Sequence, residues 1–149
     1  MKPSSLQETH DMNIKNQLFA YVLACGDPAI KIPLTRNFDN RLGPKGYFWL
    51  PELGGVKNIV SPQEKTYRDY VLQKIRDAQN VHPFGLILLV NHSQCGAYKL
   101  ARITFEDSQK EEAFHAEELK KAEEVLKKEF PELVVERHYF LKDKQRLAW

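Results

Sequence analysis

The chain lacks the sequence features that are typical of membrane, secreted or nucleic-acid-binding proteins. In its 149 residues no hydrophobic run approaches the roughly 20 residues that a membrane-spanning helix needs. Residues 1–15 are polar and contain no hydrophobic segment of a secretory signal, so we expect a cytoplasmic protein. The 22 basic residues are nearly balanced by 20 acidic ones. That balance indicates neither a nucleic-acid partner nor a membrane partner, and it leaves binding of a small polar or anionic molecule open.

Cysteine is also scarce, since the sequence holds only Cys25 and Cys95. In a reducing cytoplasm a disulfide between two such distant residues is disfavoured, and the pair is more typical of free thiols or metal ligands. A redox pair is an alternative, but no Cys-x-x-Cys motif supports it.

The hydrophobic pattern predicts one domain over residues 1–149, in which strands and helices alternate. A chain of this length can bury a single core of adequate size. Apolar runs predict strands at residues 19–24, 47–50, 57–60, 84–90 and 133–141. Two capping boxes, at residues 61–64 and 108–111, predict the starts of two helices. This order is typical of a three-layer α/β/α fold with a mainly parallel sheet.

Two segments contain neither an apolar run nor a capping box. Residues 1–15 are interpreted as a flexible arm. Residues 30–46 contain Pro33, Gly43 and mixed charges, and they predict a long loop. Because compact domains rarely need a loop of that length, this segment is a candidate functional one.

Three metal-ligating side chains follow predicted strands. Cys25 comes directly after one strand, and His92 and Cys95 come after another. Ligands of open α/β sheets bind at the carboxyl ends of the strands, so we expect these side chains at one edge. Two thiolates and an imidazole form a donor set that suits zinc and leaves a fourth position free. The other histidines lack partners at ligand spacing and are interpreted as surface or packing residues.

The two motifs resemble those of the β-class carbonic anhydrases. That family carries Cys-x-Asp-x-Arg after its first strand and His-x-x-Cys-Gly after a later one. Here residues 25–29 read Cys-Gly-Asp-Pro-Ala and residues 92–96 read His-Ser-Gln-Cys-Gly. The resemblance extends loosely over residues 18–141 and implies a β-carbonic-anhydrase-like fold. Residues 51–55 match the Arg-Asn-Ala-Gly stretch of the family poorly.

The resemblance implies a role for each motif residue. Cys25, His92 and Cys95 would be the zinc ligands. Asp27 would be the catalytic carboxylate, which either accepts a hydrogen bond from zinc-bound water or becomes the fourth ligand. Zinc-bound hydroxide would then hydrate CO2 reversibly, or hydrolyse a similar small molecule, in a homodimer or higher homo-oligomer.

The main departure from the family is Ala29, which stands where the family has an arginine that holds the aspartate. Lys31, Arg36 or Arg41, all in the predicted loop, are candidates to replace that arginine. Ala29 also favours an alternative function, that of a non-catalytic zinc-binding relative with a structural or small-anion-sensing site.

Overall fold

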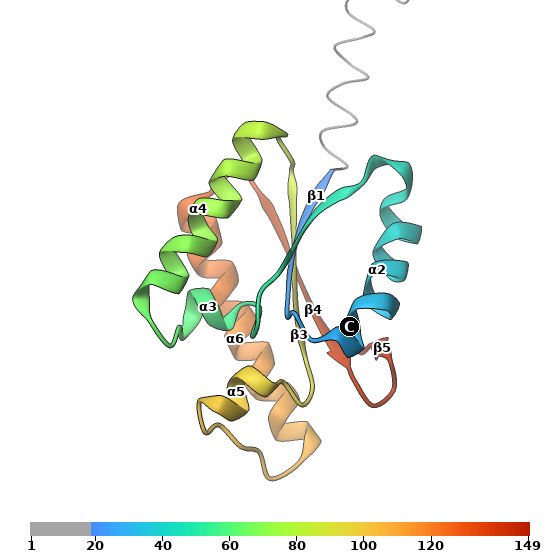
Figure 1. Cartoon of the computed structure of the whole chain (residues 1–149), viewed down its shortest axis with the longest axis vertical. Coiled ribbons are helices and arrows are strands. Elements are labelled where there is room, and N and C mark those ends of the chain that lie inside the picture. The colour runs from blue at the N-terminus through green and yellow to red at the C-terminus, as the bar shows by residue number, and fades with distance from the viewer. Residues whose placement is uncertain (1–18) are drawn as a thin grey trace, which may run out of the picture.

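The computed structural model describes residues 19–149, and the predicted arm at residues 1–15 lies outside them. Figure 1 shows a central twisted sheet with helices on both of its faces. This is the α/β architecture that the alternation of strands and helices predicts. Within the described residues, no helix is both long and apolar enough to cross a bilayer.

The sheet has five strands in the order β2-β1-β3-β4-β5. The strands are β1 (Ala20–Ala24), β2 (Tyr47–Pro51), β3 (Leu86–His92), β4 (Val134–Leu141) and β5 (Arg146–Leu147). The first four run parallel, and β5 pairs antiparallel with the end of β4. The mainly parallel sheet is therefore confirmed, although β5 was not predicted because two residues carry no periodic signal.

Helices cover the two faces unequally. The long helices are α2 (Pro28–Leu42), α4 (Lys65–Val81) and α6 (Ser108–Glu129), and the short ones are α3 (Lys57–Val60) and α5 (Gly96–Leu100). Helix α2 lies on one face of the sheet, while α3, α4 and α6 lie on the other (Figure 1). Alternate residues of β1 supply both cores, with Tyr21 and Leu23 on one side and Val22 and Ala24 on the other. This burial on both faces explains why β1 and β3 read as continuous apolar runs.

The long loop predicted for residues 30–46 is wrong, because most of it is helix α2. Ile30, Leu34 and Phe38 recur at intervals of four and are fully buried against the sheet. This apolar stripe outweighs Pro33, which lies inside the helix and removes one backbone hydrogen bond. Gly43 ends the helix, with a φ of 62° that glycine adopts without strain.

Two predictions around residue 60 are also wrong. The segment at residues 57–60 is helix α3 and not a strand, because a tight turn leads directly into it and Ile59 is buried against α4 and α6. The following helix, α4, begins at Lys65 and not at the predicted capping box. Ser61 lies three residues before Glu64, the N-cap of α4, and its hydroxyl donates a hydrogen bond to Glu118 of α6 at 3.0 Å.

Helix α6 begins at Ser108 as predicted, but a different residue caps it. The Asp107 carboxylate accepts the Lys110 N–H at 2.8 Å. Asp107→Ala should therefore lower the free energy of unfolding by about 1 kcal/mol, whereas Ser108→Ala should change it by less than about 0.5 kcal/mol. Urea denaturation of both variants measures this. A larger loss for Ser108→Ala would show that Ser108 is the cap after all.

Candidate metal centre

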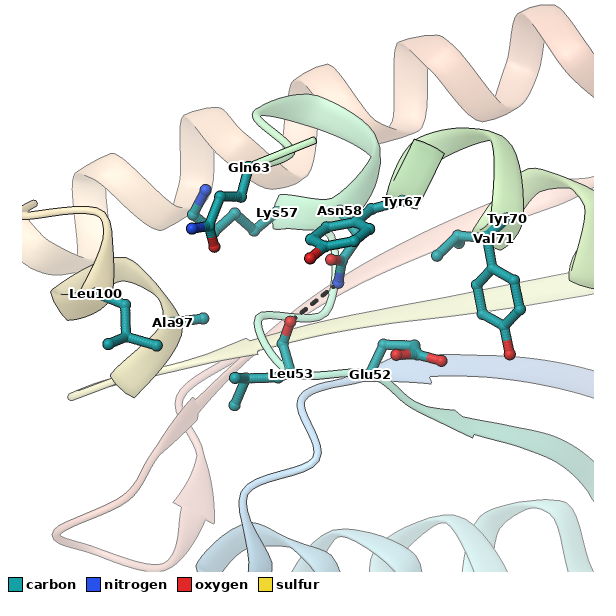
Figure 2. A pocket seen from close by; sticks show the side chains of 10 residues that line it. All are labelled: Glu52, Leu53, Lys57, Asn58, Gln63, Tyr67, Tyr70, Val71, Ala97 and Leu100. Atoms are coloured by element: carbon teal, nitrogen blue, oxygen red, sulfur yellow. Dashed lines mark hydrogen bonds between the residues drawn. The ribbon is translucent and has the colours of Figure 1, made fainter. Parts of the chain in front are cut away.

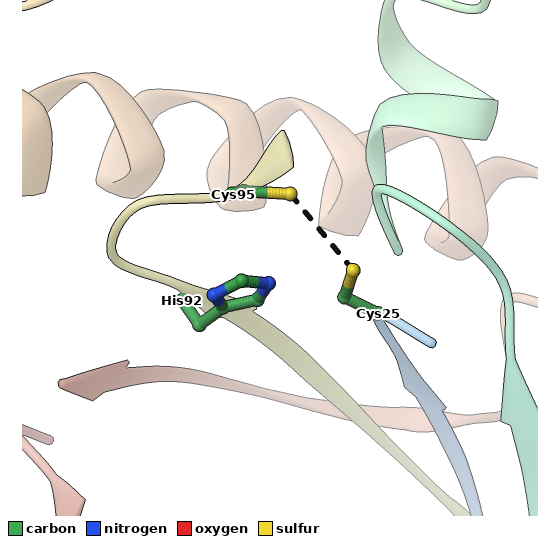
Figure 3. Close-up of side chains that lie close together, drawn as sticks. All are labelled: Cys25, His92 and Cys95. Carbon is green, nitrogen blue, oxygen red and sulfur yellow. Dashed lines mark hydrogen bonds between the residues drawn. The ribbon is translucent and has the colours of Figure 1, made fainter. Parts of the chain in front are cut away.

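Parallel pairing of β1 with β3 brings the three predicted ligands together. Ala24 lies opposite Val90, so Cys25 leaves β1 beside the end of β3, where His92 is the last residue. Cys95 follows three residues later at the N-cap of α5. The ligand atoms of Cys25, His92 and Cys95 all lie within 4.8 Å of one another, and all three residues are buried (Figure 3). These side chains could hold one metal ion.

The spacing of the two sulfurs fits a shared ion. The Sγ atoms of Cys25 and Cys95 are 3.9 Å apart. Two thiolates on a tetrahedral zinc, each about 2.3 Å from the ion, have sulfurs about 3.8 Å apart. The cluster needs little rearrangement to accept such a cation.

The His92 ring is oriented for ligation by its own main chain. Its Nδ1 lies 2.7 Å from the carbonyl oxygen of Ser93, which can only accept a hydrogen bond. In the neutral ring the proton is therefore on Nδ1, and Nε2 keeps its lone pair. Nε2 is buried and has no hydrogen-bond partner among the described residues. Metal-ligating histidines are commonly fixed in this way, and a cation would satisfy the unpaired nitrogen.

The two thiols differ in acidity because they share a hydrogen bond. The contact with Cys95 lowers the pKa of Cys25, against the opposing effect of burial, and the hydrogen bond from the Gly54 N–H lowers it further. The same contact and burial raise the pKa of Cys95. The Gly54 N–H donates to Cys25 Sγ at 3.3 Å. Cys25 is therefore the more acidic of the two thiols, and a divalent cation would stabilise both sulfurs as thiolates.

Asp27 is fixed through both of its carboxylate oxygens. It is the N-cap of α2, where Oδ1 accepts the Ala29 N–H at 2.9 Å. Oδ2 accepts a hydrogen bond from Lys142 Nζ at 2.7 Å. Burial raises the pKa of Asp27, but the hydrogen bonds from Lys142 and Ala29 outweigh it and lower the pKa overall.

The cation that contacts Asp27 is thus Lys142 and none of the three candidates. Arg41 is paired with Glu136 at 2.6 Å on another part of the surface, and Arg36 is exposed on α2. Lys31 lines a pocket of about 270 Å³ together with Cys25 and Asp27, but its amine is not the partner of Asp27. The other walls of this pocket are Gly26, Pro28, Trp49 and Pro51.

The turn between His92 and Cys95 is supported by residues that sequence reasoning missed. Gln94 has a φ of 56°, an uncommon backbone conformation for this residue, and its N–H donates to the Glu111 carboxylate at 3.0 Å. Ser93 donates its N–H to Phe140 O and accepts the Lys142 N–H on its hydroxyl. Glu111 was predicted only as part of a capping box, and no local pattern pointed to the other contacts.

On the opposite face of β3, a buried polar network packs behind the site. The Asn91 amide contacts the Tyr98 hydroxyl at 3.2 Å and His115 Nδ1 at 3.0 Å. Burial lowers the pKa of His115 to about 4, so the ring is neutral at physiological pH. Its interpretation as a packing histidine is consistent with this environment. Asn91, which precedes the candidate ligand His92, is thereby held in place.

A second pocket of about 280 Å³ lies beyond the turn that holds Gly54 (Figure 2). Leu53, Asn58, Tyr67, Ala97 and Leu100 are among its walls, and none of the three candidate ligands lines it. The Asn58 amide donates to the carbonyl oxygen of Leu53 at 3.0 Å and so stabilises the turn. The pocket therefore adjoins the candidate metal centre without being part of it.

Comparisons with known proteins agree with this architecture. No protein-family model matches the chain. Over 123 residues it is 28% identical to the uncharacterized protein RC0076 of Rickettsia conorii, covering 80% of this chain and 66% of that protein. An uncharacterized protein of Rickettsia bellii is also 28% identical over 123 residues, covering 80% and 74%. The chain therefore spans slightly less than two thirds of the length of the first of these relatives.

Solved structures with a similar fold are carbonic anhydrases. The enzyme of Streptococcus mutans superposes with a TM-score of 0.58 at 14% identity, over 99% of this chain and 98% of that one. The carbonic anhydrase of Glaciozyma antarctica gives 0.56 at 13% identity, over 99% and 95%. The tetrameric β-carbonic anhydrases of Sordaria macrospora give 0.50 at 16% identity, over 97% and 87%. The chain has the fold of these enzymes. At such low identity the likeness shows the fold alone.

The close approach of Gly54 to α5 yields a test of the site's architecture. Gly54 has a φ of 89°, and a Cβ there would lie 2.9 Å from Ala97 Cβ. Gly54→Ala should therefore lower the free energy of unfolding by roughly 1–3 kcal/mol. Gly96→Ala is the matched control, since nothing lies within 4 Å of its added Cβ and its φ is unstrained. Equal effects of the two substitutions in urea denaturation would contradict the described turn.

Proposed function

We propose that the chain is a zinc-dependent lyase that hydrates CO2 reversibly or acts on a similar small electrophile. The observation that carries the proposal is the buried cluster of Cys25, His92 and Cys95, in which His92 Nε2 has no hydrogen-bond partner among residues 19–149. The likeness in fold to carbonic anhydrases supports the choice of reaction.

The donor set supports zinc as the resident metal. Two thiolates and one imidazole suit a borderline-soft cation, whereas magnesium and calcium prefer oxygen ligands. Cys25, His92 and Cys95 would hold the ion. Zinc would supply Lewis acidity that lowers the pKa of a coordinated water to about 7.

The chain's own residues would bind the substrate and accept a proton. Asp27 shares the pocket with Cys25 and is charged at neutral pH because its pKa is lowered. Each carboxylate oxygen has a further lone pair, so Asp27 can still accept a hydrogen bond inside the pocket. Lys31 adds a positive charge that would favour an anionic product such as bicarbonate. Trp49 and Pro51 line the same pocket with apolar surface.

The proposal also includes a cytoplasmic location and a homo-oligomeric state for the protein. A cytoplasmic site would keep both cysteines reduced, as metal ligation requires. A homodimer or higher homo-oligomer is in keeping with the tetrameric state of the similar Sordaria macrospora enzymes. Exposed Leu53, Tyr67, Tyr70 and Leu100 gather around the second pocket and would supply apolar contact area (Figure 2).

Metal content is the first test of the proposed function. Purified protein should contain about one zinc per chain, because a cluster of three donors holds one ion. Cys25→Ser and His92→Ala should each lose most of that zinc in elemental analysis. His82→Ala is the matched control, since His82 is exposed and lies outside the cluster. Folded wild-type protein purified without any bound metal would contradict the proposal.

Turnover is the second test. Stopped-flow assays should detect CO2 hydration, and Asp27→Asn should lower kcat/KM by about 100-fold, as expected when a proton acceptor is lost. Zinc content should be unchanged in this variant. Wild-type turnover in Asp27→Asn would remove Asp27 from the mechanism. A zinc-loaded protein that is inactive from acidic to alkaline pH would instead support the alternative function, that of a non-catalytic zinc-binding relative.

A further inference from the structure

Lys142 lies where the end of the chain folds back onto the candidate metal centre. It follows β4 in the turn that leads to β5, 115 residues after Asp27 in sequence. Three hydrogen bonds fix it. Its N–H donates to Ser93 Oγ at 2.8 Å, its carbonyl oxygen accepts the Gln145 amide at 2.7 Å, and its Nζ donates to Asp27 Oδ2 at 2.7 Å.

These contacts join two parts of the site. Ser93 belongs to the turn that separates His92 from Cys95, and Asp27 follows Cys25 by two residues. The Lys142 backbone is anchored to Ser93 and its amine contacts Asp27, so this one residue bridges both ligand-bearing segments. The Lys142 and Asp27 side chains are 30% and 15% exposed, so water screens their attraction only in part.

The ion pair limits what the Asp27 carboxylate can do. Lys142 occupies Oδ2 and the Ala29 N–H occupies Oδ1. A carboxylate that lacked such a partner beside a divalent cation would coordinate it, because carboxylate oxygen is a good zinc ligand. With Lys142 in place, Asp27 can accept a further hydrogen bond but would be restrained from coordinating a metal at the cluster.

Among the described residues, no other lysine or arginine forms this ion pair with Asp27. Position 29 is alanine, Arg41 is paired with Glu136, and Lys31 lines the pocket without being the partner of Asp27. We propose that Lys142 is the positioning residue of the site: it holds the Asp27 carboxylate off the metal and so keeps the fourth coordination position open. This inference rests on the proposed function, since it requires a metal at the cluster.

Azide binding to cobalt-loaded protein tests the inference without any turnover. Azide can bind cobalt(II) only where a coordination position is open, and visible absorption reports its binding. Wild-type protein should bind azide. Lys142→Met should weaken binding at least tenfold, because the released Asp27 takes the open position. Lys142→Met combined with Asp27→Asn should restore wild-type affinity, since an amide is a poor ligand. Lys142→Arg should bind azide within about twofold of wild type, because it retains the cation.

Lys144→Met is the matched control, since it removes an exposed lysine from the same turn. It should leave azide affinity unchanged, and thermal melting confirms that each variant is folded. Wild-type affinity in Lys142→Met, no rescue by Asp27→Asn, or a wild-type protein that takes up cobalt but no azide would each overturn the role of Lys142. Failure to take up cobalt would contradict the metal site itself. Cobalt uptake with the expected azide pattern but no CO2 hydration would uphold Lys142 and contradict the lyase.

Discussion

The parallel pairing of β1 with β3 is the constraint on which the candidate site depends. It fixes Ala24 opposite Val90, and so sets Cys25 against the end of the strand that carries His92. A shift of this register would move Cys25 along β3 and reverse which face each β3 side chain occupies. Burial of both strands on two faces prevents such a shift, because it would place apolar side chains in the wrong core. The core of the protein thus specifies the distance between its candidate ligands.

Balance of charge is the second constraint. Cys25 carries a low pKa, Asp27 is ionised, and both line one pocket. Cys25 is buried and the Asp27 side chain is 15% exposed, and negative charges shielded from water in this way are stabilised by nearby donors or cations. The Gly54 N–H and Lys142 meet part of this need. A metal ion at the cluster would supply further positive charge and would also bind the unpaired Nε2 of His92.

The features that could be predicted from the sequence are those that depend on residues close together in the chain. Apolar runs identified β1 and β3, and two short motifs identified the three side chains that the structure brings together. The predicted loop at residues 30–46 failed because Pro33 was weighted above an apolar stripe that recurs every four residues. The contacts of Gly54 and Lys142 could not be predicted, because they join segments that are far apart in sequence and carry no periodic signal.

The ion pair between Asp27 and Lys142 concerns the arginine of the family motif, which is replaced by Ala29 in this chain. A carboxylate that is to stay uncoordinated beside a metal is stabilised by a charged donor at hydrogen-bonding distance, and that donor can come from any part of the chain. At position 29 the cation would come from the first turn of α2, whereas here it comes from the turn after β4. The two positions are far apart in sequence, yet a cationic side chain at either one would place a positive charge beside the same carboxylate. Alanine at position 29 therefore does not by itself argue against the proposed catalytic role of Asp27.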